Sequence, residues 1–272
     1  MKKTLRKIRG VLHIHTSFSY DSKLVLDNLA KFYKNQEYEF MVLAEHPRGF
    51  TNKRFNALLS KCRRLSDKNF TVIPGLELEI EGLHILAIGI QKFIKEKSFD
   101  KVISLVKKQN GLCILAHPNK YENLDIKKIS KLDGIELWDS KHDSRYFPRP
   151  NNFKLLNKIR KYNKKAIGTG GLDLHHTPDQ VKTVFISVDY NRHELRNNFI
   201  IEKLRNNQFS ISNGTINIEQ GQGIGILKTY VFTVFINIFD VLKKGKKDLS
   251  RLLEKYRIRL PGQFLMFIRR FF

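Results

Sequence analysis

The sequence predicts an α/β fold in which a parallel sheet, closed or open, carries helices on its outside. Short apolar runs typical of buried strands recur between residues 11 and 188. Most of these runs are separated by stretches whose apolar residues follow a helical spacing, and alternation of this kind favours parallel β/α units. The chain of 272 residues is also long enough to bury a large core.

The expected strands and helices follow one another along most of the chain. The strands are expected at residues 11–16, 40–46, 70–80, 84–90, 111–117, 134–140, 166–175 and 183–188. Between most of them, stretches rich in Lys, Leu and Asn are expected to form helices, the clearest being residues 24–36, 52–65, 98–109 and 151–163.

The composition changes after residue 220. The glycine-rich segment 221–225 is typical of a linker, so we expect a main domain of residues 1–220 and a helical extension of residues 221–272. The extension is aromatic and basic, with 11 Lys and Arg against 3 Asp and Glu. This composition is typical of a helix at a membrane interface, and packing on the main domain or on a second subunit is the alternative.

The charge of the whole chain favours acidic partners. There are 50 Lys and Arg against 26 Asp and Glu, which gives a net charge of +24. Such a field attracts nucleic acid, phosphorylated metabolites or an anionic membrane surface, unless the excess only reflects a general basic bias in composition.

The two cysteines, Cys62 and Cys113, lack C-x-x-C spacing, so we expect no disulfide framework and a cytoplasmic location. Neither a signal peptide nor an uninterrupted apolar run of membrane-spanning length is expected.

Histidines and acidic residues gather where the expected strands end. His13 and His15 stand at positions i and i+2 of the first run, so a strand would place both on one face. Because sites in β/α folds form at the carboxyl ends of strands, these residues favour one metal site over scattered core histidines. Imidazole and carboxylate ligands without thiolate suit zinc, manganese or iron. The candidates exceed what one ion needs, so two or three divalent ions are expected, and the candidates are His13, His15, Asp21, His46, Glu77, His84, His117, Asp173 and His175.

Seven motifs in order carry a resemblance to a known family. They are H-I-H-T-S-F-S-Y-D-S, L-A-E-H, I-P-G-L-E-L, G-L-H-I-L-A-I-G, I-L-A-H-P, G-I-E-L-W and G-T-G-G-L-D-L-H-H, and they cover roughly residues 10–215. On these motifs the chain resembles the PHP (polymerase and histidinol phosphatase) family of metal-dependent phosphoesterases. The resemblance implies a distorted (β/α)7 barrel, which is TIM-like, with a trinuclear metal site at the strand ends.

The resemblance also implies how the ligands divide. The first ion would be held by His13, His15, Glu77 and Asp173. Glu77 would bridge to a second ion on His84 and His117, and a third ion would be held by Asp21, His46 and His175. Water or hydroxide activated by the ions would attack a phosphate group.

Two further residues are expected to be catalytic. Glu45 lies in A-E-H where the family usually has T-D-H, and an acid/base role is expected for it, with a carboxylate that only binds backbone as the alternative. Arg145, on the loop after the run 134–140, is expected to bind a phosphate, with a solvated surface arginine as the alternative. The hydroxyl that the family has before its late aspartate is lost here, since G-G-L precedes Asp173. His142, His176 and His193 are expected at the surface.

These observations predict a cytoplasmic metal-dependent phosphoesterase that hydrolyses a phosphomonoester or a phosphodiester. The positive charge favours a nucleotide or a short oligonucleotide as substrate. A metal-dependent hydrolase of a C–N bond is one alternative, and a non-catalytic module that binds anions or membranes is another. Residues 224–272 are expected either to touch an anionic membrane from the cytoplasmic side or to pack and self-associate.

Overall fold

The computed structural model describes residues 6–177, 184–190, 197–220, 231–238, 240–242, 244–245 and 248. The chain divides into two compact units, Met1–Ile224 and Gly225–Phe272. The sheets and helices α1 to α6 belong to the first unit, and residues 231–238 of the second unit are helical. The domain boundary expected at residue 220 stays a prediction.

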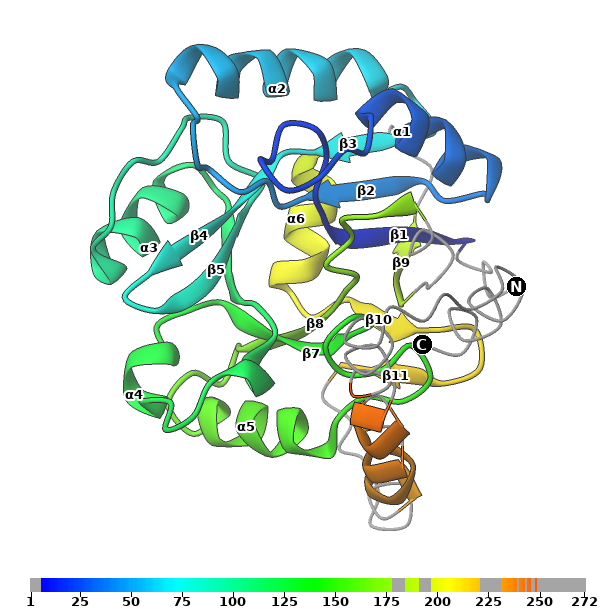
Figure 1. Ribbon diagram of the computed structural model, residues 1–272. Coiled ribbons are helices and arrows are strands. Elements are labelled where there is room, and N and C mark those ends of the chain that lie inside the picture. The colour runs from blue at the N-terminus through cyan, green and yellow to red at the C-terminus, as the bar shows by residue number, and fades with distance from the viewer. Residues whose placement is uncertain are drawn as a thin grey trace, which may run out of the picture. The chain divides into compact units, whose positions relative to one another are not determined.

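The first sheet has six strands in the order β11-β10-β9-β1-β2-β3 (Figure 1). Strands β1, β2 and β3 run parallel, whereas β9 pairs antiparallel with both β1 and β10, and β10 pairs antiparallel with β11. The strands are β1 (Arg6–Ile14), β2 (Phe40–Leu43), β3 (Thr71–Ile73), β9 (Phe185–Tyr190), β10 (Phe209–Ser212) and β11 (Asn217–Glu219).

The second sheet has five strands in the order β4-β5-β6-β7-β8. Strand β5 is antiparallel to both of its neighbours, and β6, β7 and β8 are parallel. The strands are β4 (Gly75–Ile80), β5 (Leu83–Ile88), β6 (Leu112–Leu115), β7 (Gly134–Asp139) and β8 (Ile167–Gly171). Two isolated bridges, Ile14 with Leu174 and Glu45 with Leu76, link the two sheets.

The expected (β/α)7 TIM-like barrel is wrong. The described strands form two mixed sheets and no closed barrel. One reason is Pro74, which has no N–H for a ladder hydrogen bond and splits the run 70–80 into β3 and β4, in different sheets. A second reason is the tight turn at Glu81 and Gly82, whose φ values of 51° and 78° suit a hairpin and make β4 and β5 antiparallel.

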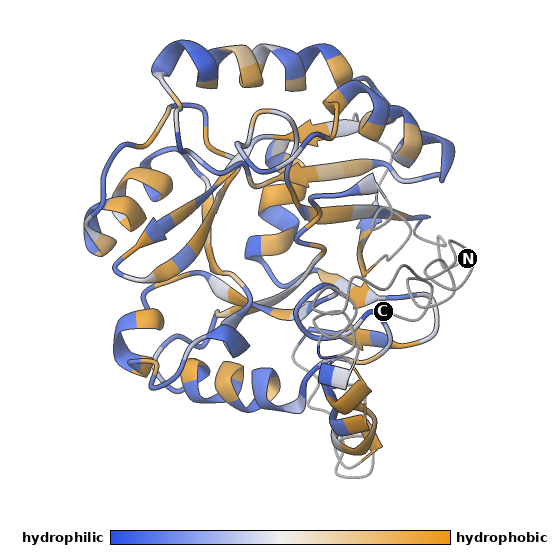
Figure 2. Ribbon diagram, in the orientation of Figure 1, coloured by the Kyte–Doolittle hydropathy of each residue, from blue (hydrophilic) through white to orange (hydrophobic). Residues whose placement is uncertain are grey.

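Helices α1 to α5 lie around the outside of the strands, whereas α6 lies in the middle of the view in Figure 1. In Figure 1, α1 and α2 lie along the top of the view, α3 on the left, and α4 and α5 along the bottom. Figure 2 shows that the strands are mostly hydrophobic, whereas the helices carry alternating hydrophobic and hydrophilic residues. The helices are α1 (Leu26–Asn35), α2 (Asn52–Leu65), α3 (Phe99–Lys108), α4 (Ile126–Ile129), α5 (Pro150–Arg160) and α6 (Asn197–Arg205), with a short 3-10 helix η1 (Pro118–Lys120).

Local sequence explains where two of these helices lie. Helix α1 buries Leu26, Leu29, Ala30 and Tyr33, which is the i, i+3, i+4, i+7 spacing of a single helix face. Helix α2 begins after Thr51, whose hydroxyl accepts the backbone N–H of Arg54 and caps the first turn.

The described residues give facts about the cysteines and about membrane contact. Cys62 and Cys113 are both buried and free. In the part of the chain that the structure describes, every helix is too short or too polar to cross a membrane. Within the second unit, Val241 and Leu242 are exposed, but most of residues 243–272 lie outside the described residues. Membrane contact or self-association of this unit therefore stays a prediction.

Candidate metal centre

The strand ends bring all nine predicted ligands into overlapping groups. His13 lies in β1, Glu77 in β4 and His84 in β5, and the other six lie in the connections that follow strands. Three groups of these side chains have ligand atoms within 4.8 Å of one another, close enough to hold an ion. The groups are His13, His15, Glu77 and Asp173; Glu77, His84 and His117; and His15, Asp21, His46 and His175.

The first group has the spacing of a metal's ligand shell. Glu77 Oε2 lies 3.2 Å from His13 Nε2 and 3.3 Å from His15 Nε2, and Asp173 Oδ1 lies 3.4 Å from His15 Nε2. Two ligands that each bind a zinc ion at about 2.1 Å lie roughly 3.0 to 3.4 Å apart, depending on the angle between them. These three separations therefore match those of ligands that share one ion, and the separation between His13 Nε2 and Asp173 Oδ1 is longer, at 3.7 Å.

Glu77 joins the first group to the second. Its Oε1 atom lies 2.6 Å from His84 Nδ1 and 2.9 Å from His117 Nε2, which are hydrogen-bond distances. Its Oε2 atom faces His13, His15 and His46. One buried carboxylate thus presents one oxygen to each set of imidazoles, the arrangement that a bridging ligand needs.

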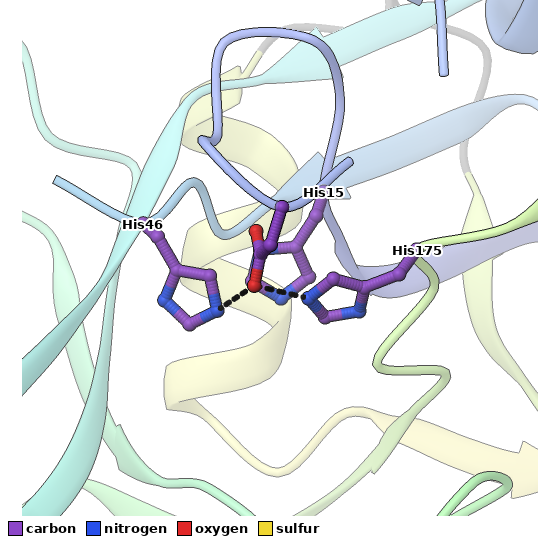
Figure 3. A group of neighbouring side chains, drawn as sticks. His15, His46 and His175 are labelled. Carbon is purple, nitrogen blue, oxygen red and sulfur yellow. Dashed lines mark ion pairs between the residues drawn. The ribbon is translucent and has the colours of Figure 1, made fainter. Parts of the chain in front are cut away.

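The third group converges on the carboxylate of Asp21. Asp21 Oδ2 lies 3.4 Å from His46 Nε2 and 3.3 Å from His175 Nε2. Figure 3 shows the rings of His15, His46 and His175 around this carboxylate, with the two ion pairs dashed. The side chain of Asp21 is partly exposed, so this group borders the solvent.

Three expected ligands have a left-handed backbone. The φ angles are 68° at His13, 30° at His117 and 45° at Asp173, and each residue lies at or just beyond the carboxyl end of a strand. Left-handed residues other than glycine cost of order 1–3 kcal/mol each and cluster at functional sites. At His13 the conformation coincides with an irregularity in the pairing of β1 with β2, so simple strand alternation does not set its direction.

Glu136 orients two of the histidines from behind. Its Oε1 atom lies 2.7 Å from His13 Nδ1, and its Oε2 atom accepts the backbone N–H of His117 at 2.7 Å. A carboxylate can only accept, so His13 Nδ1 donates and its Nε2 faces the first group. Carboxylates commonly hold metal-binding histidines in this way.

Burial and charge set unusual protonation equilibria in the centre. Burial opposes the charged form of Glu77 and Asp173, but the surrounding histidines outweigh burial and lower the pKa of both carboxyls well below the usual range. Burial lowers the pKa of His13, yet Glu136 and Glu77 raise it well above its ordinary value. Burial, together with the neighbouring His15, lowers the pKa of His46 to about 4. The centre therefore holds buried anionic carboxylates that require cations beside them.

The donor set fits divalent metal ions. Nε2 of His15 and Nδ1 of His117 are buried and lack a hydrogen-bond partner among the residues that the structure describes. Buried polar atoms are normally paired, so Nε2 of His15, which faces two carboxylates, indicates a position for a cation. All ligands are nitrogen or oxygen atoms, which suits zinc, manganese or iron.

The structure places Glu45 beside the centre but in none of its ligand groups. Its buried carboxylate accepts the backbone N–H of Thr16 at 3.0 Å and also the hydroxyls of Thr16 and Ser19. Ser19 in turn accepts the backbone N–H of His46. These contacts fix the loop that follows β1, and the acid/base role of Glu45 stays a prediction.

Arg145 lies on the loop after β7, as expected, but contacts a neighbour on that loop. Its guanidinium lies 4.7 Å from the centre of the Tyr146 ring and donates to the Tyr146 hydroxyl. It belongs to none of the ligand groups, and its role in binding a phosphate stays a prediction.

Besides Glu136, two more residues that the sequence analysis did not select lie at the centre. His142, expected at the surface, has its Nε2 atom 2.5 Å from Asp173 Oδ2, and burial lowers the pKa of His142 to about 4. Lys141 Nζ lies 3.0 Å from the same oxygen. Both follow the carboxyl end of β7, so the rule that picked the ligands after the other strands would also have found them.

A cavity of about 530 Å³ opens beside the centre. His46, Glu77 and His84 line it on the side of the ligand groups. The rest of its lining is aromatic, aliphatic and charged with both signs, and includes Tyr20, Arg48, Phe50, Glu79, Phe93, Ile94, Lys95, Glu96 and Lys97. The cavity can therefore receive a group with an apolar or aromatic part.

The fold resembles that of a solved structure. No family model and no curated protein matches the chain. Among solved structures, a two-domain protein from Bacteroides vulgatus that contains a predicted PHP-like metal-dependent phosphoesterase has a TM-score of 0.57 at 16% identity. The match covers 76% of this chain and 65% of that protein, so the chain spans about two thirds of its length. This likeness shows the fold.

Two further structures are more distant. A protein from Bifidobacterium adolescentis, named as a putative metal-dependent phosphoesterase, has a TM-score of 0.45 at 15% identity, with 72% of this chain and 94% of that chain covered. An amidohydrolase from Chromobacterium violaceum with bound sulfate and no metal has a TM-score of 0.46 at 12% identity, with 71% and 95% covered.

Proposed function

We propose that this chain is a metal-dependent phosphoesterase that hydrolyses a phosphomonoester or a phosphodiester at a multinuclear site. One observation carries the proposal: the two oxygens of Glu77 face two separate sets of histidines. Adjacent ion positions that share a carboxylate are suited to phosphoryl transfer, because both the attacking and the leaving oxygen need stabilisation.

The chain's own residues prepare the site. Divalent ions bound here would activate a water molecule and withdraw charge from the phosphate. Glu136 fixes the ring of His13, and Glu77 and Asp173 supply negative charge that is already oriented. Because these side chains are buried, little solvent competes with them for the divalent ions that they would hold.

We propose a nucleotide or a short oligonucleotide as the substrate. The cavity beside the centre supports this choice, because Tyr20 is exposed at its edge and the guanidinium of Arg48 lies 5.1 Å from the centre of that ring. Aromatic and guanidinium faces stack on bases. Lys95 and Lys97 add positive charge, which Glu79 and Glu96 of the same lining partly offset. The net charge of +24 also favours an anionic substrate.

The test is phosphate release from a panel of phosphoesters with Mn²⁺ present. The panel holds a nitrophenyl phosphate, a nucleoside 3′,5′-bisphosphate, a short 5′-phosphorylated RNA and histidinol phosphate. We expect His15→Ala and Asp173→Ala to lower turnover by roughly 100-fold or more and to lose bound metal, because each removes a ligand. His176→Ala, at an exposed neighbouring histidine, should behave like the wild type.

Two results would contradict the proposal. One is a folded, metal-loaded chain that releases no phosphate from any member of the panel. The other is phosphate release that persists in both ligand variants. Hydrolysis of amides in place of phosphoesters would identify a C–N hydrolase instead.

A further inference from the structure

The two oxygens of the Asp173 carboxylate have different partners. Oδ1 faces the expected ligands, 3.4 Å from His15 Nε2 and 3.1 Å from His175 Nδ1. Oδ2 lies 2.5 Å from His142 Nε2 and 3.0 Å from Lys141 Nζ. One carboxylate thus connects the ligand groups to two consecutive residues of the loop after β7.

The two partners of Oδ2 are held differently. The side chain of His142 is 17% exposed and its ring packs against His117, with ring centres 4.7 Å apart. The side chain of Lys141 is 41% exposed. His142 is therefore fixed by packing, whereas the ammonium group of Lys141 borders the solvent.

Lys141 also contacts a residue of the third ligand group. Its Nζ atom lies 3.2 Å from His175 Nδ1, and the same Nδ1 atom lies 3.0 Å from the backbone carbonyl of Asp173. The ammonium group of Lys141 therefore lies beside residues of the first and the third group.

We propose that Lys141 binds the substrate phosphate. His142 is then the positioning residue that keeps Asp173 in place while Lys141 contacts the phosphate. This inference rests on the proposed function, because it takes Asp173 as a metal ligand. A divalent ion on Oδ1 neutralises the carboxylate and repels the ammonium group. A phosphate at the ions then offers an anion within reach of the flexible lysine side chain.

The geometry favours Lys141 over Arg145 in this role. Arg145 lies on the same loop, but its guanidinium stacks on Tyr146. Lys141 contacts residues of two ligand groups, Asp173 of the first and His175 of the third. A phosphate that spans these groups would therefore meet Lys141 directly.

The first experiment measures binding of inorganic phosphate to the full metal-loaded chain by calorimetry, without turnover. We expect Lys141→Met to weaken phosphate binding roughly 10- to 100-fold, because a hydrogen bond from a charged group is lost. The amount of bound metal should not change. Lys141→Arg should retain most of the affinity. The matched control is Lys127→Met, at an exposed lysine of α4, which should leave phosphate affinity as in the wild type.

The role of His142 has its own readout. We expect His142→Ala to weaken metal binding roughly 10-fold or more, because Asp173 loses its fixed donor, whereas His142→Gln, which keeps an N–H, should restore part of it. Lys141→Met should not share this metal defect. A loss of metal in Lys141→Met, or unchanged metal affinity in His142→Ala, would overturn the assignment of the two roles.

A second measurement needs no variant. Acetylation of the Lys141 amine in the wild type, followed by mass spectrometry, should speed up when metal is added and slow down when phosphate follows. A rate that phosphate does not change, or a wild type that binds no phosphate, would overturn the inference. Phosphate binding through Lys141 without hydrolysis of any phosphoester would instead overturn only the proposed function.

Discussion

At the scale of single residues, carboxylates decide how the histidines are used. Glu77 presents its two oxygens to two sets of imidazoles, and Glu136 fixes His13 from the opposite ring nitrogen. Glu45 acts one step further away, since it holds the loop that carries Ser19, and Ser19 accepts the backbone N–H of His46. The ligand positions thus depend on acidic residues with different tasks.

Glu45→Ala should destabilise the protein without removing a ligand. The change leaves the buried N–H of Thr16 and the hydroxyls of Thr16 and Ser19 without their acceptor. Buried groups that lose a partner cost about 1–3 kcal/mol each, and partial relaxation should hold the total near about 3 kcal/mol. Urea denaturation measures the loss.

Glu45→Gln separates stability from catalysis. This variant keeps the size of the side chain and one acceptor oxygen. The predicted acid/base role requires kcat to fall far more than stability does, at full metal content. If kcat stays within a few-fold of the wild type, Glu45 positions the loop and does not transfer a proton.

At the scale of secondary structure, the chain's path between sheets places the ligands. The break at Pro74 moves the chain from β3 in one sheet to β4 in the other, and Glu77 lies in β4. The entry to β3 is anchored by Asp67, whose Oδ1 accepts the backbone N–H of Asn69 at 2.8 Å and of Phe70 at 2.9 Å. Its Oδ2 accepts from Lys34 of α1 at 2.7 Å.

Asp67→Asn should lower stability at neutral pH and not in acid. Burial opposes the charged form of Asp67, but the donors from Lys34 and the backbone together outweigh it and lower the pKa of its carboxyl. The stabilisation is therefore present above the unfolded pKa of about 4 and is lost as the pH falls through the folded value. Because the side chain is half exposed, we expect about 1 kcal/mol at pH 7 and almost none near pH 2.

Urea denaturation of both proteins at the two pH values measures this difference. Glu122→Gln, at an exposed glutamate in the loop before α4, serves as the matched control and should show no such dependence. A deficit of Asp67→Asn that persists undiminished in acid would mean that the amide perturbs the turn itself and not its electrostatics.

At the scale of the whole molecule, burial of charge makes the fold depend on cations. The first unit encloses several carboxylates and histidines within 4.8 Å of one another, while the chain as a whole carries a net charge of +24. Long-range attraction therefore draws anions toward the protein, and local repulsion among the buried carboxylates favours bound cations.

Removal of metal should lower the melting temperature. A ligand at about 100 times its Kd stabilises the folded state by about 2.7 kcal/mol, which corresponds to roughly 5–10 °C for a domain of this size. Thermal melts of the wild type with Mn²⁺ and with a chelator measure the shift. In Asp173→Ala the shift should be much smaller, and an equal shift in both proteins would place the metal elsewhere.

Local patterns were enough to find several elements and to select the ligand candidates. Apolar runs marked β1, β2 and β6, and helical spacing marked α2 with its bounds, because both periodicities are properties of neighbouring residues. Histidines and carboxylates at the ends of those runs could be selected one by one, because residue type and position along the chain are local facts. Whether each residue binds an ion stays a prediction.

Only the tertiary structure decided how the strands pair and what stands behind the ligands. The antiparallel setting of β5, the division into two sheets and the return of β9 beside β1 depend on partners far away in the sequence. The contacts of His142 and Lys141 with Asp173 likewise join residues about 30 positions apart. The sequence by itself determined which residues could bind metal, and long-range pairing decided which of them meet, because hydrogen bonds between distant strands leave no local pattern.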